Sequence, residues 1–110
     1  MDRDLIWVVE KDNIVEGFSH LAMMSEVSAE ILGLYLSQKM IGQGAGRELF
    51  LLMQAEALNQ GIQQIELLAT LTAKDFYQKM GCQEISGLTS LMFGGVPIRC
   101  VPMMYKFQLR

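Results

Sequence analysis

The sequence predicts a mixed α/β fold of the α+β kind, a single domain of residues 1–110 with about six strands in a central sheet and two helices. Three observations predict it. Strand-like and helix-like periodicities alternate along the chain. A glycine-rich segment, residues 41–46, separates a predicted strand from an amphipathic helix. A further strand follows that helix, and this order implies a right-handed crossover between two parallel strands.

The first part of the chain is predicted as three strands. Residues 5–10 and 14–23 are apolar runs on either side of a polar turn, which is the pattern of a hairpin. Residues 29–37 form the third strand. Its alternation with period two places four side chains on one face: Glu30, Leu32, Leu34 and Leu36. Glu30 precedes three leucines on this face, so its carboxylate lies either at a solvated strand end or in a catalytic position.

The second part alternates between helix and strand. The predicted elements are a helix over residues 47–59, a strand over 63–71, a helix over 73–80 and a strand over 82–86. Glycines directly after the two helices mark their C-terminal ends. Residues 87–97 contain three glycines and a proline and are predicted to form a loop, and residues 98–109 form the last strand.

Composition excludes several classes of protein. The net charge is −3, the sequence pI is about 5.0 and no basic stripe is visible, so nucleic-acid binding is not expected. No apolar run reaches the roughly 18 residues of a membrane helix, and the N-terminus does not resemble a signal peptide. The two cysteines, Cys82 and Cys100, form neither a disulfide framework nor a metal cluster. We therefore expect reduced thiols in a cytoplasmic protein without a metal.

The glycine-rich segment has the general form of a phosphate-binding loop, because a helix N-terminus follows it. The dinucleotide fingerprint G-x-G-x-x-G requires glycine at position 47 or 49, where the chain has Arg47 and Leu49. The P-loop requires Gly-Lys-Ser/Thr, but Arg47 is preceded by Gly46 and followed by Glu48. A glycine-rich turn that binds no ligand is the alternative interpretation.

The loop that does fit is the coenzyme A loop of the GNAT acyltransferases, usually Q/R-x-x-G-x-G/A. It falls on residues 41–46, with Gly44 and Gly46 at the two glycine positions. Ile41 stands where the family usually has Gln or Arg, and Arg47 is positioned to compensate. Cys82 is a second departure, since phenylalanine is common at that position after the helix glycine.

Three further segments resemble the GNAT superfamily in the correct order. Residues 29–36, Ala-Glu-Ile-Leu-Gly-Leu-Tyr-Leu, are similar to its central strand. Residues 72–81 are similar to its A-x-x-F-Y-x-x-x-G helix, and residues 95–106 to the closing strand of many small bacterial members. The resemblance therefore covers nearly the whole chain.

The resemblance implies an acyl-CoA-dependent N-acyltransferase that moves an acetyl group from acetyl-CoA to a primary amine by direct attack. It implies Glu30 as general base, through a water molecule, and Tyr77 as general acid. Alternatively, Glu30 is a solvated or ion-paired surface residue and Tyr77 only packs on the core. The coenzyme-binding residues implied are Leu34, Tyr35, Leu36, Ile41, Gly42, Gln43, Gly44, Ala45, Gly46, Arg47, Thr72 and Phe76.

The family fold normally begins with a strand and two helices that wall the acceptor site, whereas residues 1–4 alone precede the first predicted strand. Three explanations stay open: a second subunit supplies the wall, the acceptor is large, or the chain is a remnant. A catalytically inactive or partner-dependent coenzyme-binding module is the alternative function. Because apolar surface would be exposed, we also expect a homodimer formed through the C-terminal strands.

Overall fold

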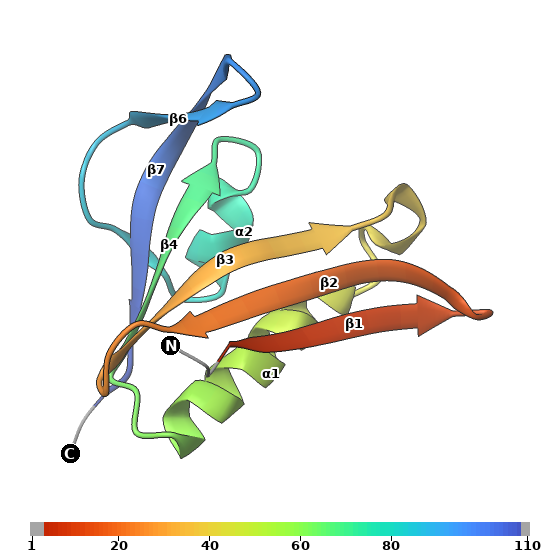
Figure 1. Ribbon diagram of the computed structural model, residues 1–110, viewed down its shortest axis with the longest axis horizontal. Coiled ribbons are helices and arrows are strands. Elements are labelled where there is room, and N and C mark those ends of the chain that lie inside the picture. The colour runs from red at the N-terminus through yellow and green to blue at the C-terminus, as the bar shows by residue number, and fades with distance from the viewer. Residues whose placement is uncertain (1–3, 109–110) are drawn as a thin grey trace.

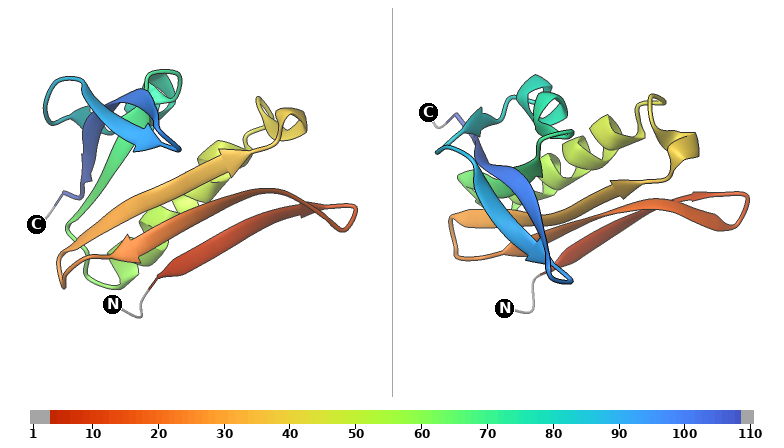
Figure 2. Two further views of the ribbon diagram at one scale, coloured as in Figure 1. Left: turned by 45° about the horizontal axis from the view of Figure 1, so that its top comes forward. Right: turned by 90° about the horizontal axis from the view of Figure 1, so that it is seen from above.

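The computed structural model describes residues 4–108. The chain folds into a seven-stranded mixed sheet with both helices on one face (Figures 1 and 2). The strand order is β1-β2-β3-β4-β7-β5, and β6 also pairs with β7. The elements in chain order are β1 (Leu5–Lys11), β2 (Ile14–Met23), β3 (Ser28–Leu36), the 3-10 turn η1 (Gln38–Met40), α1 (Ala45–Asn59), β4 (Gln64–Thr70), α2 (Lys74–Lys79), β5 (Gln83–Glu84), β6 (Thr89–Phe93) and β7 (Val96–Lys106). The α+β fold is confirmed.

The hairpin of β1 and β2 is antiparallel, as predicted, and turns at two residues with positive φ, Asp12 at 54° and Asn13 at 65°. Asx residues tolerate this left-handed conformation, and two successive left-handed residues give the turn whose twist matches a hairpin. The polar turn in the sequence therefore determines where the chain reverses.

The packed core lies between the sheet and the two helices. On α1, Leu49, Phe50, Met53 and Ala57 recur at helical spacing and are each at most 2% exposed. They pack on side chains of the central strands, among them Ile65 of β4. Each fully buried Leu, Phe or Met contributes about 1.5–3 kcal/mol, so this face of α1 fixes the helix on the sheet. In the described part of the chain, no helix is long and apolar enough to cross a membrane.

The parallel strands β3 and β4 are paired only over their first halves. The register runs from Ser28 opposite Gln64 to Ile31 opposite Leu67. Beyond that point β3 continues beside β2 alone and β4 continues beside β7 alone, among the residues described. Figure 1 shows the two strands separating as they run away from the shared end. The parallel arrangement of the two strands was predicted from the sequence and is confirmed.

The prediction of which side chains of β3 share a face was wrong, because the strand contains a bulge. His20 of β2 lies opposite Gly33, but the next residue, Leu21, lies opposite Ile31, so Leu32 is left as the extra residue. Before the bulge, Ile31 faces the helices. After it, Leu34 packs against the same core.

Strict alternation had predicted that Glu30 and Leu34 lie on the same face of the sheet. In the structure they lie on opposite faces. One inserted residue shifts the period-two pattern by one position.

A second correction concerns residues 87–97, which were predicted as a loop. They contain β6 and the start of β7, joined by a turn at Gly94 and Gly95 with φ of 53° and 81°. The glycines that suggested a loop are concentrated in the two-residue turn of a hairpin, where positive φ is required. The sheet consequently has seven strands instead of about six.

Gly17 in β2 provides a test of the close approach between β2 and β3. A Cβ added there would lie 2.6 Å from the carbonyl oxygen of Tyr35 and 2.8 Å from a methyl of Leu36. We expect Gly17→Ala to lower the free energy of unfolding by about 1–3 kcal/mol, the usual cost of overpacking. Urea unfolding measures this. Gly87→Ala is the matched control, because nothing lies within 4 Å of the added atom. Equal urea midpoints for the two variants would contradict the assigned contact.

Candidate active site

The opening between β3 and β4 contains a cavity of about 420 Å³. Its lining comes from the end of β3, the glycine loop and the start of α2. The lining residues are Leu34, Tyr35, Leu36, Ile41, Thr72, Ala73, Phe76 and Tyr77. All except Ala73 were predicted as site residues from the sequence. The structure thus brings the start of α2 beside the end of β3 and the glycine loop, which lie about 30 residues earlier in the chain.

The backbone of β3 forms one wall of this opening. Its second half has β2 as partner on one side, and the described chain provides no paired strand on the other. The peptide groups that point into the opening are therefore free to bind an extended ligand in the manner of an added strand.

The glycine loop adopts the conformation that its glycines allow. Gly42 and Gly44 have φ of 82° and 84°, in the left-handed region that favours glycine. Gly44 is the N-cap of α1, and its carbonyl accepts the first helical bond, from the amide of Glu48 at 3.0 Å. The amides of the first helical turn point out of the helix and, with the helix dipole, favour an anion. The helix begins at Ala45, two residues before the predicted start.

Gly46 has a different role from the other two loop glycines, because it is buried where three elements meet. A Cβ there would lie 3.3 Å from a ring carbon of Phe76 and 3.4 Å from a methyl of Leu36. A hydrogen in that position lets α1 approach β3 and α2 closely. The ring of Phe76 therefore packs directly against Gly46 at the end of the glycine loop.

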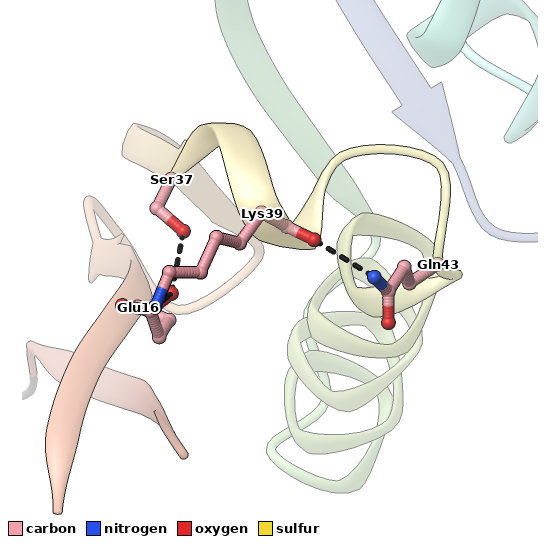
Figure 3. A network of polar contacts seen from close by, with 4 residues as sticks. All are labelled: Glu16, Ser37, Lys39 and Gln43. Atoms are coloured by element: carbon pink, nitrogen blue, oxygen red, sulfur yellow. Dashed lines mark hydrogen bonds and ion pairs between the residues drawn. The ribbon is translucent and has the colours of Figure 1, made fainter. Parts of the chain in front are cut away.

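A buried carboxylate anchors the turn between β3 and the glycine loop, and sequence reasoning missed it. Glu16 of β2 is 5% exposed. Its Oε2 accepts a hydrogen bond from Ser37 Oγ at 2.9 Å, and its carbonyl accepts one from the Ser37 amide at 2.7 Å. Lys39 Nζ lies 4.0 Å from the same carboxylate, and Gln43 Nε2 donates to the Lys39 carbonyl at 2.8 Å (Figure 3). An acidic residue in the middle of an apolar strand was the available signal.

Tyr77 lies in the core with its ring between Phe50 and Phe76, at centroid distances of 6.3 and 5.1 Å. Burial raises the pKa of Tyr77 to about 12, and the neighbouring Cys82 raises it further as a minor cause. Burial also raises the pKa of the Cys82 thiol to about 11. Both groups are therefore neutral at physiological pH, and the phenol retains a proton that it can donate in a hydrogen bond.

Glu30 does not line the cavity that contains Tyr77. It is half-buried on the face of the sheet away from the helices and lies opposite Glu66 in the parallel register. It borders two other cavities, of about 320 and 220 Å³. Leu34 lies four positions further along the strand, which corresponds to roughly 13 Å. The structure therefore places the two predicted catalytic residues in separate cavities.

A fourth cavity, of about 300 Å³, lies between these two regions. It shares Leu34, Ala73 and Tyr77 with the cavity at the glycine loop, and it shares Leu32, Leu68 and Phe93, among others, with the cavity beside Glu30. This cavity, called the passage below, thus adjoins both the cavity at the glycine loop and the cavity beside Glu30 on the other face of the sheet. In residues 4–108 no group of three His, Cys, Asp or Glu side chains could hold a metal ion.

A parallel strand pair that opens beside a glycine loop and a helix N-terminus defines an acetyltransferase type of fold. The sequence model of the acetyltransferase (GNAT) domain matches residues 2–84. The chain therefore belongs to the GNAT acetyltransferase family. Comparison with curated protein sequences gave no match.

Solved structures of this family share the fold. The ribosomal-protein-S18-alanine N-acetyltransferase from Escherichia coli is 15% identical with a TM-score of 0.82, and the match covers 100% of this chain and 73% of that one. An IAA acetyltransferase from Bacillus cereus ATCC 14579 is 18% identical with a TM-score of 0.78, covering 96% and 79%. A GNAT family acetyltransferase from Elizabethkingia anophelis, solved with acetyl-CoA bound, is 15% identical with a TM-score of 0.74, covering 93% and 75%.

Because Tyr77 is buried, we expect its phenol to lose its proton only at a pH above the usual range for tyrosine. A folded pKa of about 12, against 10.0 for an unburied tyrosine, means that the stability due to this group is complete below pH 10. It is lost as the pH rises from 10 through 12. Tyrosinate absorbance, measured as the difference between the native protein and Tyr77→Phe, should have its midpoint near pH 12. A midpoint near pH 10 while far-ultraviolet circular dichroism remains native would contradict the burial.

Proposed function

We propose that the protein is an acyl-CoA-dependent N-acyltransferase that transfers the acetyl group of acetyl-CoA to a primary amine. The observation that carries this proposal is the cavity of about 420 Å³ at the opening of β3 and β4, beside the glycine loop. It lies where an extended thioester arm can pair with the free edge of β3. The acetyl-CoA in the Elizabethkingia anophelis structure supports this identity of the coenzyme.

Coenzyme binding follows from the backbone. The amides and carbonyls of residues 34–36 bind the amides of the pantetheine arm as an added strand would. The pyrophosphate lies on the amides of residues 42–47, where the dipole of α1 adds positive potential. Arg47 is exposed in the first turn of α1 and supplies the charge that Ile41 lacks. Thr72 and Phe76 close the opposite side of the cavity.

The reaction is a direct attack of the amine nitrogen on the thioester carbon. The N–C bond forms as the C–S bond breaks, and the amine proton passes through water to Glu30, because the carboxylate lies in the adjoining cavity. Tyr77 lines both the coenzyme cavity and the passage. Its neutral hydroxyl transfers its proton to the departing sulfur, so that CoA leaves as a free thiol and water returns a proton to the phenolate, and Tyr77 thus acts as the general acid.

A titration calorimetry experiment with acetyl-CoA and free CoA tests the coenzyme site, and we expect micromolar binding to both. Tyr77→Phe should leave the affinity for CoA unchanged and lower kcat by about 100-fold, a typical effect of removing an acid catalyst. Glu30→Gln should lower kcat similarly. Tyr105→Phe is the matched control, because Tyr105 contacts Phe50 and Phe107 and does not line this cavity. We expect kcat of this control to equal that of the native protein.

The same experiment separates the alternative function. A protein that binds CoA but releases no thiol with any amine is a catalytically inactive or partner-dependent coenzyme-binding module. Equal kcat in the native protein and Tyr77→Phe would remove the acid role. Absence of binding to CoA would contradict the proposal as a whole.

We propose in addition that the protein acts as a homodimer in the cytoplasm, where its two buried free cysteines would stay reduced. Large apolar side chains are more than half exposed on β1 and β2, namely Ile6, Val8, Ile14 and Val15, and on the C-terminal strands, where Met92 and Val96 are examples. Exposed apolar surface of this kind often marks an interface.

Light scattering at micromolar concentration should give twice the chain mass of 12.4 kDa. Met92→Lys should shift the mass toward that of one chain if the C-terminal strands form the interface, and Val8→Lys if β1 does. A monomeric native protein would contradict the dimer.

A further inference from the structure

Apolar side chains line a groove on the far side of the passage from the glycine loop. Its floor is β4, and its walls are β3 and the hairpin of β6 and β7. The large apolar residues of the groove are Leu32, Leu68, Leu91, Phe93 and Ile98. They are between 37% and 62% exposed in the described chain, so their surface is available to a ligand.

The groove adjoins the proposed site of reaction. It shares Leu32, Leu68, Thr70 and Phe93 with the passage, and the passage contains Tyr77. The two cavities measure about 320 and 300 Å³, at the lower end of the range for sites of small ligands. A molecule whose nitrogen reaches the passage therefore has its remaining atoms beside Phe93 and its apolar neighbours.

The charge around the groove is negative. Glu30 borders it, and Glu66 is the register partner of Glu30 on the neighbouring strand. Within residues 4–108 neither carboxylate forms an ion pair, although Gln64 Nε2 donates to Glu66 Oε2 at 3.4 Å. No lysine or arginine of the described chain lines the passage or the two cavities beside Glu30. The groove is therefore complementary to a cation at its acidic border and to uncharged hydrocarbon elsewhere.

We infer that the acceptor is a small monoamine carried on an apolar body, such as an alkyl or aryl group, and this inference rests on the proposed acetyl transfer. The ammonium is attracted by Glu30 and Glu66 before it loses its proton. The apolar body lies against Leu91 and Phe93 of β6. A second charge on that body would have to give up water against hydrocarbon, so a diamine of equal length is a poor acceptor.

Three amines test the inference: n-hexylamine, ethylamine and 1,6-diaminohexane, each with acetyl-CoA and detection of the released thiol. We expect kcat/KM for n-hexylamine to exceed that of both others by about tenfold or more, the discrimination that hydrocarbon contacts provide. Calorimetry with the CoA-bound protein should show binding of n-hexylamine and weaker binding of 1,6-diaminohexane.

Variants locate the effect in the groove. Phe93→Ala and Leu91→Ala should raise KM for n-hexylamine about tenfold, with little change for ethylamine and none in the affinity for CoA. Leu88→Ala is the matched control, because Leu88 directly precedes β6 and is 58% exposed but lines none of these cavities. It should leave KM unchanged.

The outcomes distinguish this inference from the proposed function. Loss of CoA binding would overturn the proposed function, and with it the basis of the inference. Intact CoA binding with equal or better turnover of 1,6-diaminohexane would overturn the acceptor class alone. Intact CoA binding without binding of n-hexylamine, or an equal effect of Leu88→Ala and Phe93→Ala, would do the same.

Discussion

The arrangement of the site depends on the point at which β3 and β4 cease to be paired. Four register pairs, ending at Ile31 and Leu67, hold the two strands together, and no pair follows in the described chain. Each strand keeps its outer partner, β2 for β3 and β7 for β4. The sheet therefore opens without losing either strand, and the peptide groups on the free edge of β3 have no neighbouring strand on that side among the described residues. The passage between the faces of the sheet follows from the same opening.

The opening is kept in position by contacts that lie outside it. The face of α1 that carries Phe50 and Met53 is fully buried against the sheet, so packing fixes the position of the helix. Gly46 lets the first turn of that helix lie close to Leu36 and Phe76. Glu16, buried in β2, ties the chain that leaves β3 through two hydrogen bonds to Ser37. These contacts determine where the glycine loop begins, and the conformation of the loop follows from left-handed angles at Gly42 and Gly44.

Local signals in the sequence were sufficient for most of the fold and for most of the residues that line the cavity at the glycine loop. The period of each element, the glycines at the ends of the helices and the loop at residues 41–46 are properties of neighbouring residues, and they predicted nearly all the lining of the coenzyme cavity. The features that were missed depend on pairing between distant segments. The bulge at Leu32 exists only relative to β2, and it moved Glu30 and Leu34 to opposite faces. The role of Glu16 likewise depends on Ser37, 21 residues away in the chain.

The two sides of the passage differ in how they would achieve specificity. On the side of the glycine loop the available contacts are mostly backbone groups and a helix dipole, which depend on the conformation of the chain and suit a coenzyme with a constant structure. On the other side the contacts are exposed side chains of a short hairpin, Leu91 and Phe93, whose replacement would leave the sheet intact. Tyr77 lies between the two sides and is buried in the core, so its position is tied to packing that both sides share. The proposed acid catalysis by Tyr77 is thereby coupled to the stability of the fold, while the proposed selection of the acceptor rests on exposed side chains of the β6 and β7 hairpin.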